Sequence, residues 1–176
     1  MQKKIVITGG PGTGKTTLIK ALRDMDYECF MEISRQVTRQ AQEDGIEQLF
    51  LEKPLLFSEL LLSGRIKQFH DANLKQESLV FFDRGIPDVH AYMNYLGSDY
   101  PELFIEQSKT YRYDKVFIMP PWEEIYISDQ ERYESFEQAL AIYNHLKNAY
   151  LELGYDLIEI PTGTIEQRVS FLLEHI

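Results

Sequence analysis

Residues 4–16 read KIVITGGPGTGKT, in which a short apolar run passes directly into a glycine-rich loop. The run has the length and composition of a buried strand, and glycines with a proline mark a tight loop after it. Apolar residues at helical spacing, Leu18, Ile19, Leu22 and Met25, follow the loop. Strand, loop and helix in this order form the opening unit of a parallel sheet, so this stretch predicts an α/β fold.

The loop matches the pattern G-x-x-x-x-G-K-[ST] at every fixed position, which is typical of a phosphate-binding P-loop. Its glycines let the backbone turn tightly, so that successive N–H groups point at phosphate oxygens. We expect Lys15 to reach the β- and γ-phosphates of ATP or GTP, Thr16 to bind Mg²⁺ and Thr17 to contact the α-phosphate. The predicted nucleotide-binding residues of this stretch are Gly9, Gly10, Pro11, Gly12, Thr13, Gly14, Lys15, Thr16 and Thr17.

Four further apolar runs, at 29–31, 79–82, 116–119 and 157–160, alternate with helical patterns. This alternation predicts right-handed crossovers and a mostly parallel sheet covered on both faces. We therefore expect a three-layer P-loop fold of the nucleoside- or nucleotide-kinase kind, with five strands and a single domain over residues 1–176. Ligands of such sheets bind at the carboxyl ends of the strands.

Charge and composition limit the classes of molecule that the chain is expected to bind. Its 18 basic and 28 acidic residues give a net charge of −10, which argues against nucleic acid and against an anionic membrane surface as partners. No stretch approaches the roughly 20 apolar residues needed to cross a bilayer, and no signal-peptide pattern is present. The one cysteine, Cys29, excludes an internal disulfide and fits a reducing compartment. These features predict a cytoplasmic protein that binds a small molecule.

The third strand ends in Asp83-Arg84, a pair that helps to separate the classes of P-loop protein. An acidic residue at this point is the expected second anchor of Mg²⁺. A motor-type ATPase would place a glutamate directly after that aspartate, and a GTPase would carry D-x-x-G and N-K-x-D motifs, which the chain lacks. Asp-Arg resembles small-molecule kinases, in which the arginine faces the phosphates or the acceptor. The alternatives are a strand-end turn for Asp83 and a surface ion pair for Arg84.

Several stretches along nearly the whole chain carry a more specific resemblance. They are ITGGPGTGKTT (7–17), EISR (32–35), FDRGIPD (82–88), DQER (129–132), YLELGY (150–155) and Ile160-Pro161. With these the chain resembles the small AAA-type P-loop family that includes the nicotinamide-riboside kinase domain of bifunctional NAD-synthesis regulators. The resemblance implies a kinase-like fold and nucleotide binding, and it does not fix the acceptor. The DNA-reading and adenylyltransferase parts of those regulators have no counterpart here, so neither repression nor dinucleotide synthesis is expected.

Three polar residues near the ends of the second and third strands are candidates for the acceptor site. Glu32 could accept or orient the proton of the acceptor hydroxyl, or be a solvated loop carboxylate. Arg35 would lie on the same side if a helix begins at Ser34, and could pair with Glu32 or with a phosphate. Asp88 could bind a sugar hydroxyl, or supply negative charge to a helix N-terminus.

Residues 120–135, after the fourth strand, occupy the position of a kinase lid. In this segment Arg132 could stabilise the charge of the transferring phosphoryl group. Trp122 could stack on a ring of the acceptor or pack the base of the lid. Pro161 and Thr162 end the fifth strand, where the backbone is expected to meet the base of ATP or GTP.

Two functions follow from these residues. The first is a small-molecule kinase that transfers the γ-phosphoryl group of ATP or GTP, with Mg²⁺, to a hydroxyl of a nucleoside-like or other small acceptor. The alternative is a nucleotide-dependent switch or slow NTPase that binds a protein partner. A kinase requires a closed, polar cavity beside the γ-phosphate, whereas a switch requires an exposed responsive surface. The acceptor and the oligomeric state stay open at this point. The proposed catalytic residues are Lys15, Glu32, Asp83, Arg84 and Arg132.

Overall fold

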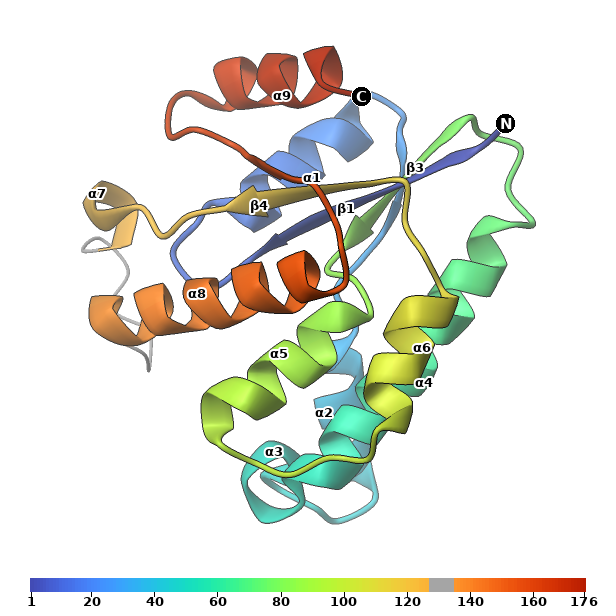
Figure 1. Cartoon of the computed structure of the whole chain (residues 1–176), viewed down its shortest axis with the longest axis vertical. Helices are drawn as coiled ribbons and strands as arrows, with labels where there is room; N and C mark the ends of the chain where they lie inside the picture. The colour runs from blue at the N-terminus through green and yellow to red at the C-terminus, as the bar shows by residue number, and fades with distance from the viewer. Residues whose placement is uncertain (127–134) are drawn as a thin grey trace.

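The computed structural model describes residues 1–126 and 135–176, and within them the chain forms one five-stranded sheet whose pairings are all parallel (Figure 1). The spatial order is β2-β3-β1-β4-β5. The strands are β1 (Lys3–Gly9), β2 (Glu28–Phe30), β3 (Leu79–Asp83), β4 (Lys115–Met119) and β5 (Leu157–Glu159). The predicted parallel sheet is confirmed, and each strand begins and ends within one residue of the predicted run.

Helices cover both faces of the sheet, as the alternating pattern predicted (Figure 1). α1 and α9 lie on one face, and α4, α5, α6 and α8 form the layer on the other. The helices are α1 (Lys15–Asp24), α2 (Ser34–Glu43), α3 (Leu49–Glu52), α4 (Pro54–Ala72), α5 (Pro87–Leu96), α6 (Leu103–Thr110), α7 (Glu123–Tyr126), α8 (Phe136–Glu152) and α9 (Ile165–Glu174).

The central strand β1 pairs with β3 and β4 along its two edges, and the helical layers bury both of its faces. Its side chains alternate between the two layers, as those of any strand do. Ile5 and Ile7 pack with α1 and with Leu172 of α9. Val6 points to the opposite core, where Tyr150 of α8 is fully buried. The glycine-rich loop is therefore held at the carboxyl end of the most buried strand.

Local signals in the sequence account for several helix ends. Pro54 is the first residue of α4, where the missing N–H of proline is not needed. The side chain of Thr164 accepts from the backbone N–H of Gln167, and the Gln167 side chain accepts from that of Thr164, so the two residues form a capping box at the start of α9. Gly154, just after α8, has the left-handed φ of 75° expected of a residue beyond a helix end.

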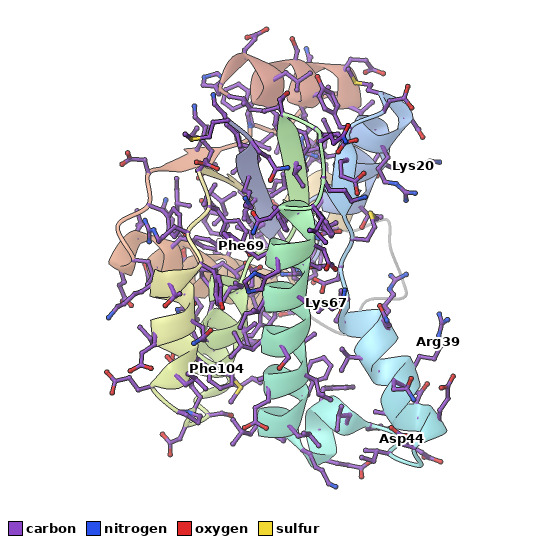
Figure 2. All side chains as sticks on the ribbon, turned by 90° about the vertical axis from the view of Figure 1, so that its right-hand side faces the viewer. Lys20, Arg39, Asp44, Lys67, Phe69 and Phe104 are labelled. Carbon is purple, nitrogen blue, oxygen red and sulfur yellow. The ribbon has the colours of Figure 1, made fainter. Side chains whose placement is uncertain are left out.

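α2 and α3 lie away from the sheet. Figure 2 shows α2, which carries Arg39, to one side of α4, and α6, which carries Phe104, to the other. Of the residues of α2 only Ala41 is buried. Within the part of the chain that the structure describes, none of the helices is both long and apolar enough to span a bilayer.

Candidate active site

The glycine-rich loop has the backbone geometry that phosphate binding requires. Gly12 and Gly14 have φ of 74° and 75°, a conformation that glycine adopts without strain. A Cβ at Gly9 would lie 2.8 Å from the Met119 carbonyl oxygen, so a side chain does not fit there. The first turn of α1 contains no acidic residue and no side-chain cap, and Thr16 and Thr17 are exposed. Its backbone N–H groups and these hydroxyls are therefore available to an anion.

Lys15 and Asp83 form an ion pair in which the side chains are 9% and 4% exposed. They meet because Asp83, the last residue of β3, is paired in register with Ile7 of β1. Burial lowers the pKa of Lys15 and the nearby Arg84 lowers it further, whereas Asp83 opposes both. The lysine and the acid expected to serve the phosphates and Mg²⁺ thus lie together at the loop.

The residues near the loop fit a magnesium ion shared with a nucleotide. Among the described residues no group of three or more His, Cys, Asp or Glu could hold a metal ion. Mg²⁺ usually takes one or two carboxylates and completes its shell with phosphate oxygens and water. Asp83 and the Thr16 hydroxyl are the protein groups that could supply such a partial shell.

Arg84 is held in an uncommon conformation. Its φ of 74° lies in the left-handed region, which costs a non-glycine residue on the order of 1 kcal/mol. Its backbone N–H donates to the Ile7 carbonyl at 3.0 Å. Its guanidinium pairs with Glu32 and Asp88, and lies 5.2 Å from the ring centroid of Tyr92. These contacts hold the guanidinium at the carboxyl edge of the sheet.

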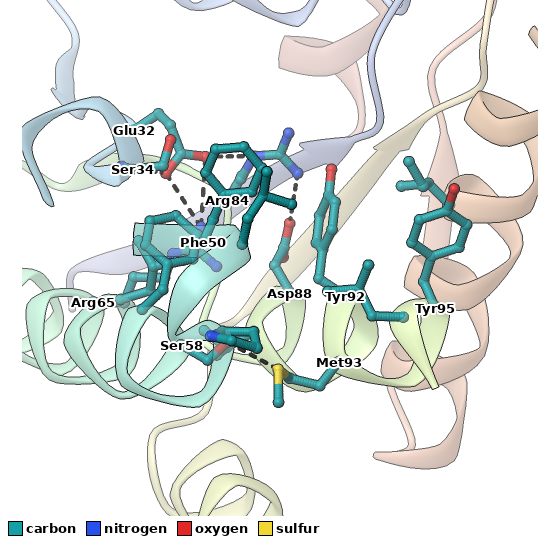
Figure 3. Close-up of a pocket in the computed structure, with 17 residues that line it drawn as sticks. Glu32, Ser34, Phe50, Ser58, Arg65, Arg84, Asp88, Tyr92, Met93 and Tyr95 are labelled. Carbon is teal, nitrogen blue, oxygen red and sulfur yellow. Dashed lines mark hydrogen bonds and ion pairs between the residues drawn. The ribbon is translucent and has the colours of Figure 1, made fainter. Parts of the chain in front are cut away.

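The Glu32 carboxylate lies between Arg65 and Arg84 (Figure 3). One of its oxygens also accepts from the backbone N–H groups of Ile33 and Ser34, at 2.9 and 3.1 Å. Burial would raise the pKa of Glu32, but the charges of the two arginines outweigh it and lower the pKa to about 2. A carboxylate of this pKa is a weak base, so it is suited to accept a hydrogen bond and orient its donor.

Asp88 is placed differently from the expected contact with a sugar. It is fully buried and accepts from the hydroxyls of Thr8 and Tyr150, both at 2.6 Å, and from the Gly85 N–H at 3.1 Å. Arg84 is its fourth partner, at 3.3 Å. Because four donors from the protein already share the carboxylate, Asp88 holds Arg84 and the β3–α5 turn in place and does not offer an oxygen to a ligand.

A cavity of about 380 Å³ opens beside Glu32 (Figure 3). Its polar end is formed by Glu32, Arg65, Arg84 and Asp88, and most of its remaining wall is apolar. A kinase requires a closed, polar cavity beside the γ-phosphate, and this cavity is polar at one of its ends. This volume is within the range of small-molecule sites.

Four other predicted residues that the structure describes, Arg35, Trp122, Pro161 and Thr162, do not line this cavity. Arg35 follows the start of α2 at Ser34, as expected, but it is exposed and forms no ion pair with Glu32. The backbone N–H of Trp122 donates to the Gly12 carbonyl at 2.9 Å, which places Trp122 against the phosphate loop, and Trp122 does not line the cavity. Pro161 and Thr162 are exposed between β5 and α9. Arg132 lies outside the described residues.

Two arginines of this region belong to no motif and were not predicted. Arg65 in α4 is 4% exposed and donates to the Gly85 carbonyl at 2.9 Å as well as to Glu32. Arg168 in α9 is 3% exposed and donates to the Thr13 carbonyl of the loop at 2.9 Å. The sequence does contain a signal for them, because both arginines interrupt the apolar stripe of a helix. An arginine at a buried position is rare unless it is paired, so such an interruption indicates a buried partner.

A protein-family model described as an AAA domain matches residues 4–168. The chain belongs to this family. The resemblance inferred from the sequence is therefore confirmed at the level of the family. A search of curated proteins found no match.

Solved structures similar to this AAA domain include two kinases and the NadR protein. A deoxyadenosine kinase from M. mycoides, with products dCMP and dCDP, has a TM-score of 0.72 at 16% identity, over 98% of this chain and 97% of that one. The thymidylate kinase of Candida albicans has a TM-score of 0.67 at 15% identity, over 99% and 91%. The NadR protein in complex with NR has a TM-score of 0.71 at 17% identity, over 98% of this chain and 49% of that one. At such identities the likeness shows the fold, which is that of nucleoside and nucleotide kinases.

Proposed function

We propose that this AAA domain is a kinase that transfers the γ-phosphoryl group of ATP or GTP to a hydroxyl of a small, uncharged acceptor. The observation that carries the proposal is the Glu32 carboxylate, fixed between Arg65 and Arg84 at the polar end of a cavity. The Lys15–Asp83 pair of the phosphate loop neighbours this cluster, because Arg84 directly follows Asp83. The kinase fold of the similar structures supports the same function.

On the nucleotide side, residues 9–17 would wrap the triphosphate, with Lys15 on the β- and γ-phosphates. Thr16 and Asp83 would hold Mg²⁺, which neutralises the charge that develops on the phosphates. Trp122 and the turn at Pro161-Thr162 are proposed for the base, because Trp122 contacts the loop. We take residues 1–176 as one catalytic domain. The half-buried free thiol of Cys29 suits a reducing compartment, so we propose the cytoplasm as its location.

On the acceptor side, the charges favour a neutral compound. Each arginine that lines the cavity already has a carboxylate partner: Glu32 pairs with Arg65 and Arg84, and Asp88 with Arg84. An acceptor that carried its own phosphate would need cations without such partners. A hydroxyl compound without charge needs only an acceptor for its O–H, and Glu32 provides one. This favours an acceptor without a phosphate over a nucleotide.

The chemistry proposed for the chain is positioning and charge stabilisation. Phosphoryl transfer passes through a loose transition state that requires little covalent help from the protein. Glu32, with its pKa of about 2, would orient the attacking hydroxyl through a hydrogen bond, and Arg84 would face the transferring group. The role of Arg132 in a lid over residues 120–135 stays a prediction from the sequence.

A screen of hydroxyl compounds tests the proposal. The protein is incubated with Mg-ATP and each compound, and both ADP and phosphorylated product are measured, the latter by mass spectrometry. We expect one or more acceptors to stimulate ADP formation with an equal amount of phosphorylated acceptor. ADP formation that no compound stimulates, with free phosphate as the product, would instead support the slow NTPase or switch.

A further inference from the structure

The two ends of the cavity beside Glu32 differ in polarity. Beyond the polar end, its wall is made mainly of large apolar side chains from α3, α4 and α5 (Figure 3). They include Phe50, Leu51, Phe57, Leu61, Val89 and Met93. An acceptor whose hydroxyl reaches Glu32 must therefore place the rest of its body against these side chains.

The apolar part of the cavity offers few groups that could recognise a polar ligand. No residue that lines it carries a side-chain amide, and all of the lining residues are described by the structure. Away from Glu32 and its arginines, the polar side-chain groups are the Asp88 carboxylate, which already accepts from four donors of the protein, and the hydroxyls of two serines and two tyrosines. The hydroxyl of Ser58 lies 2.9 Å from the Met93 sulfur, on the apolar wall. A nucleobase presents several donors and acceptors on its edges, and few of them would find partners here.

The mouth of the cavity is also apolar. Phe50, Leu51 and Leu96 line the cavity and are 48%, 64% and 58% exposed. Exposed apolar side chains that adjoin a cavity often mark a surface that a ligand covers. Here they extend the apolar wall from the interior to the solvent, so a ligand longer than the cavity would continue to gain apolar contact.

We propose that the acceptor is an alcohol whose hydroxyl-bearing carbon is attached to an aliphatic or aromatic body, in place of a polar nucleobase. This inference rests on the proposed kinase function. The hydroxyl oxygen attacks the γ-phosphorus, the bond from that phosphorus to the β–γ bridging oxygen breaks, and the hydroxyl proton is released. The products are ADP and a phosphate monoester of the alcohol.

An apolar wall gives a characteristic specificity. Each methylene buried against it strengthens binding by about fourfold. A hydrogen-bonding group buried there without a partner weakens binding by about ten- to a hundredfold. The chain should therefore prefer longer alcohols in a graded way and discriminate weakly between isosteres.

A ladder of straight-chain alcohols, from 1-butanol to 1-decanol, tests this inference beside 2-phenylethanol and the common nucleosides. We measure kcat/KM for each from the phosphorylated product in Mg-ATP. The expected result is a rise of about fourfold per methylene until the cavity is filled, with nucleosides below the better alcohols. A flat ladder, with nucleosides as the preferred acceptors, would overturn the inference.

Binding without transfer separates this inference from the kinase proposal. In Lys15→Ala protein, 1-octanol should raise the melting temperature, because the cavity does not depend on the phosphate loop. If 1-octanol binds and no alcohol or nucleoside is phosphorylated, the kinase proposal fails and the apolar ligand class stands. If 1-octanol does not bind, the apolar ligand class is wrong, whatever compound is phosphorylated.

A matched pair of substitutions assigns the effect to the cavity wall. Phe50→Asn changes a half-exposed side chain at the mouth, and should flatten the upper part of the alcohol ladder. Leu55→Asn changes an apolar side chain of similar exposure, 38% against 48%, that does not line the cavity. It should leave the ladder unchanged. Equal responses of the two variants would contradict the proposal that the apolar part of the acceptor binds in this cavity.

Discussion

Replacing Glu32 by glutamine tests the cluster on which the proposed acceptor site depends. The substitution keeps the size of the side chain but removes the anion shared by Arg65 and Arg84. Both guanidiniums, 4% and 15% exposed, would then lack that partner. We expect transfer to the acceptor to fall by orders of magnitude, and the free energy of unfolding to fall as well.

The size of the stability loss follows from the pKa of Glu32. The pKa falls from an ordinary value of 4.5 to about 2 on folding, which at about 1.4 kcal/mol per pKa unit corresponds to about 3 kcal/mol. The general cost of breaking a buried ion pair, about 3–5 kcal/mol, agrees with this figure. For a chain of this length the melting temperature should drop by about 6–12 °C.

The pH dependence has a defined sign. Because folding lowers the pKa, the stabilisation by Glu32 is fully present above pH 4.5 and is lost as the pH falls towards 2. The difference in melting temperature between wild type and Glu32→Gln, followed by circular dichroism, should therefore be constant near pH 7 and shrink below pH 4.5. A difference that is absent at pH 7, or that does not change with acid, would refute the assigned pairing.

Glu28→Gln is the matched control for this prediction. Glu28 begins β2, the strand that precedes Glu32, and it pairs with Lys75 at 2.9 Å, but the two side chains are 28% and 40% exposed. Exposed pairs contribute about 0–1 kcal/mol. The control should therefore lower the melting temperature by no more than a few degrees.

Substitutions at three further positions test other parts of the site. Lys15→Ala should weaken Mg-ATP binding, measured by calorimetry, by at least about tenfold, because it removes a charged donor to the phosphates. An unchanged affinity would show that residues 9–17 do not bind the triphosphate. Arg84→Gly and Arg84→Ala should both lose transfer, with the glycine variant about 1 kcal/mol more stable in urea because φ is positive there; equal stabilities would argue against the left-handed conformation. Arg168→Ala should raise the KM for ATP more than it lowers kcat, because Arg168 donates a hydrogen bond to the Thr13 carbonyl of the phosphate loop. An unchanged KM would show that Arg168 stabilises the fold and does not affect nucleotide binding.

The fold could be predicted because its signals are local. Strand runs, a complete P-loop, the proline at the start of α4 and the Thr164 capping box each lie within a few consecutive residues. From these runs, the rule that ligands bind at the carboxyl ends of parallel strands predicts that Glu32 and Asp83 lie at one end of the sheet.

The remaining site residues depend on contacts between distant parts of the chain. Asp88 takes its two closest donors from Thr8 and Tyr150, 80 and 62 residues away. Arg65 reaches Glu32 across 33 residues, and Arg168 reaches the phosphate loop across 155. No pattern of neighbouring residues encodes such pairings, so the sequence left both a sugar contact and a helix N-terminal charge open for Asp88 and assigned no role to the two arginines.

The most direct test of the proposed function follows the phosphorus atom. The protein is incubated with Mg-ATP labelled with ³²P at the γ-position and with an acceptor from the screen, and the label is separated into acceptor and free phosphate. The account predicts label on the acceptor hydroxyl, in an amount equal to the ADP formed, and a large loss of that label in Glu32→Gln protein that still binds Mg-ATP. Label found only in free phosphate with every acceptor, or undiminished transfer by Glu32→Gln, would contradict it.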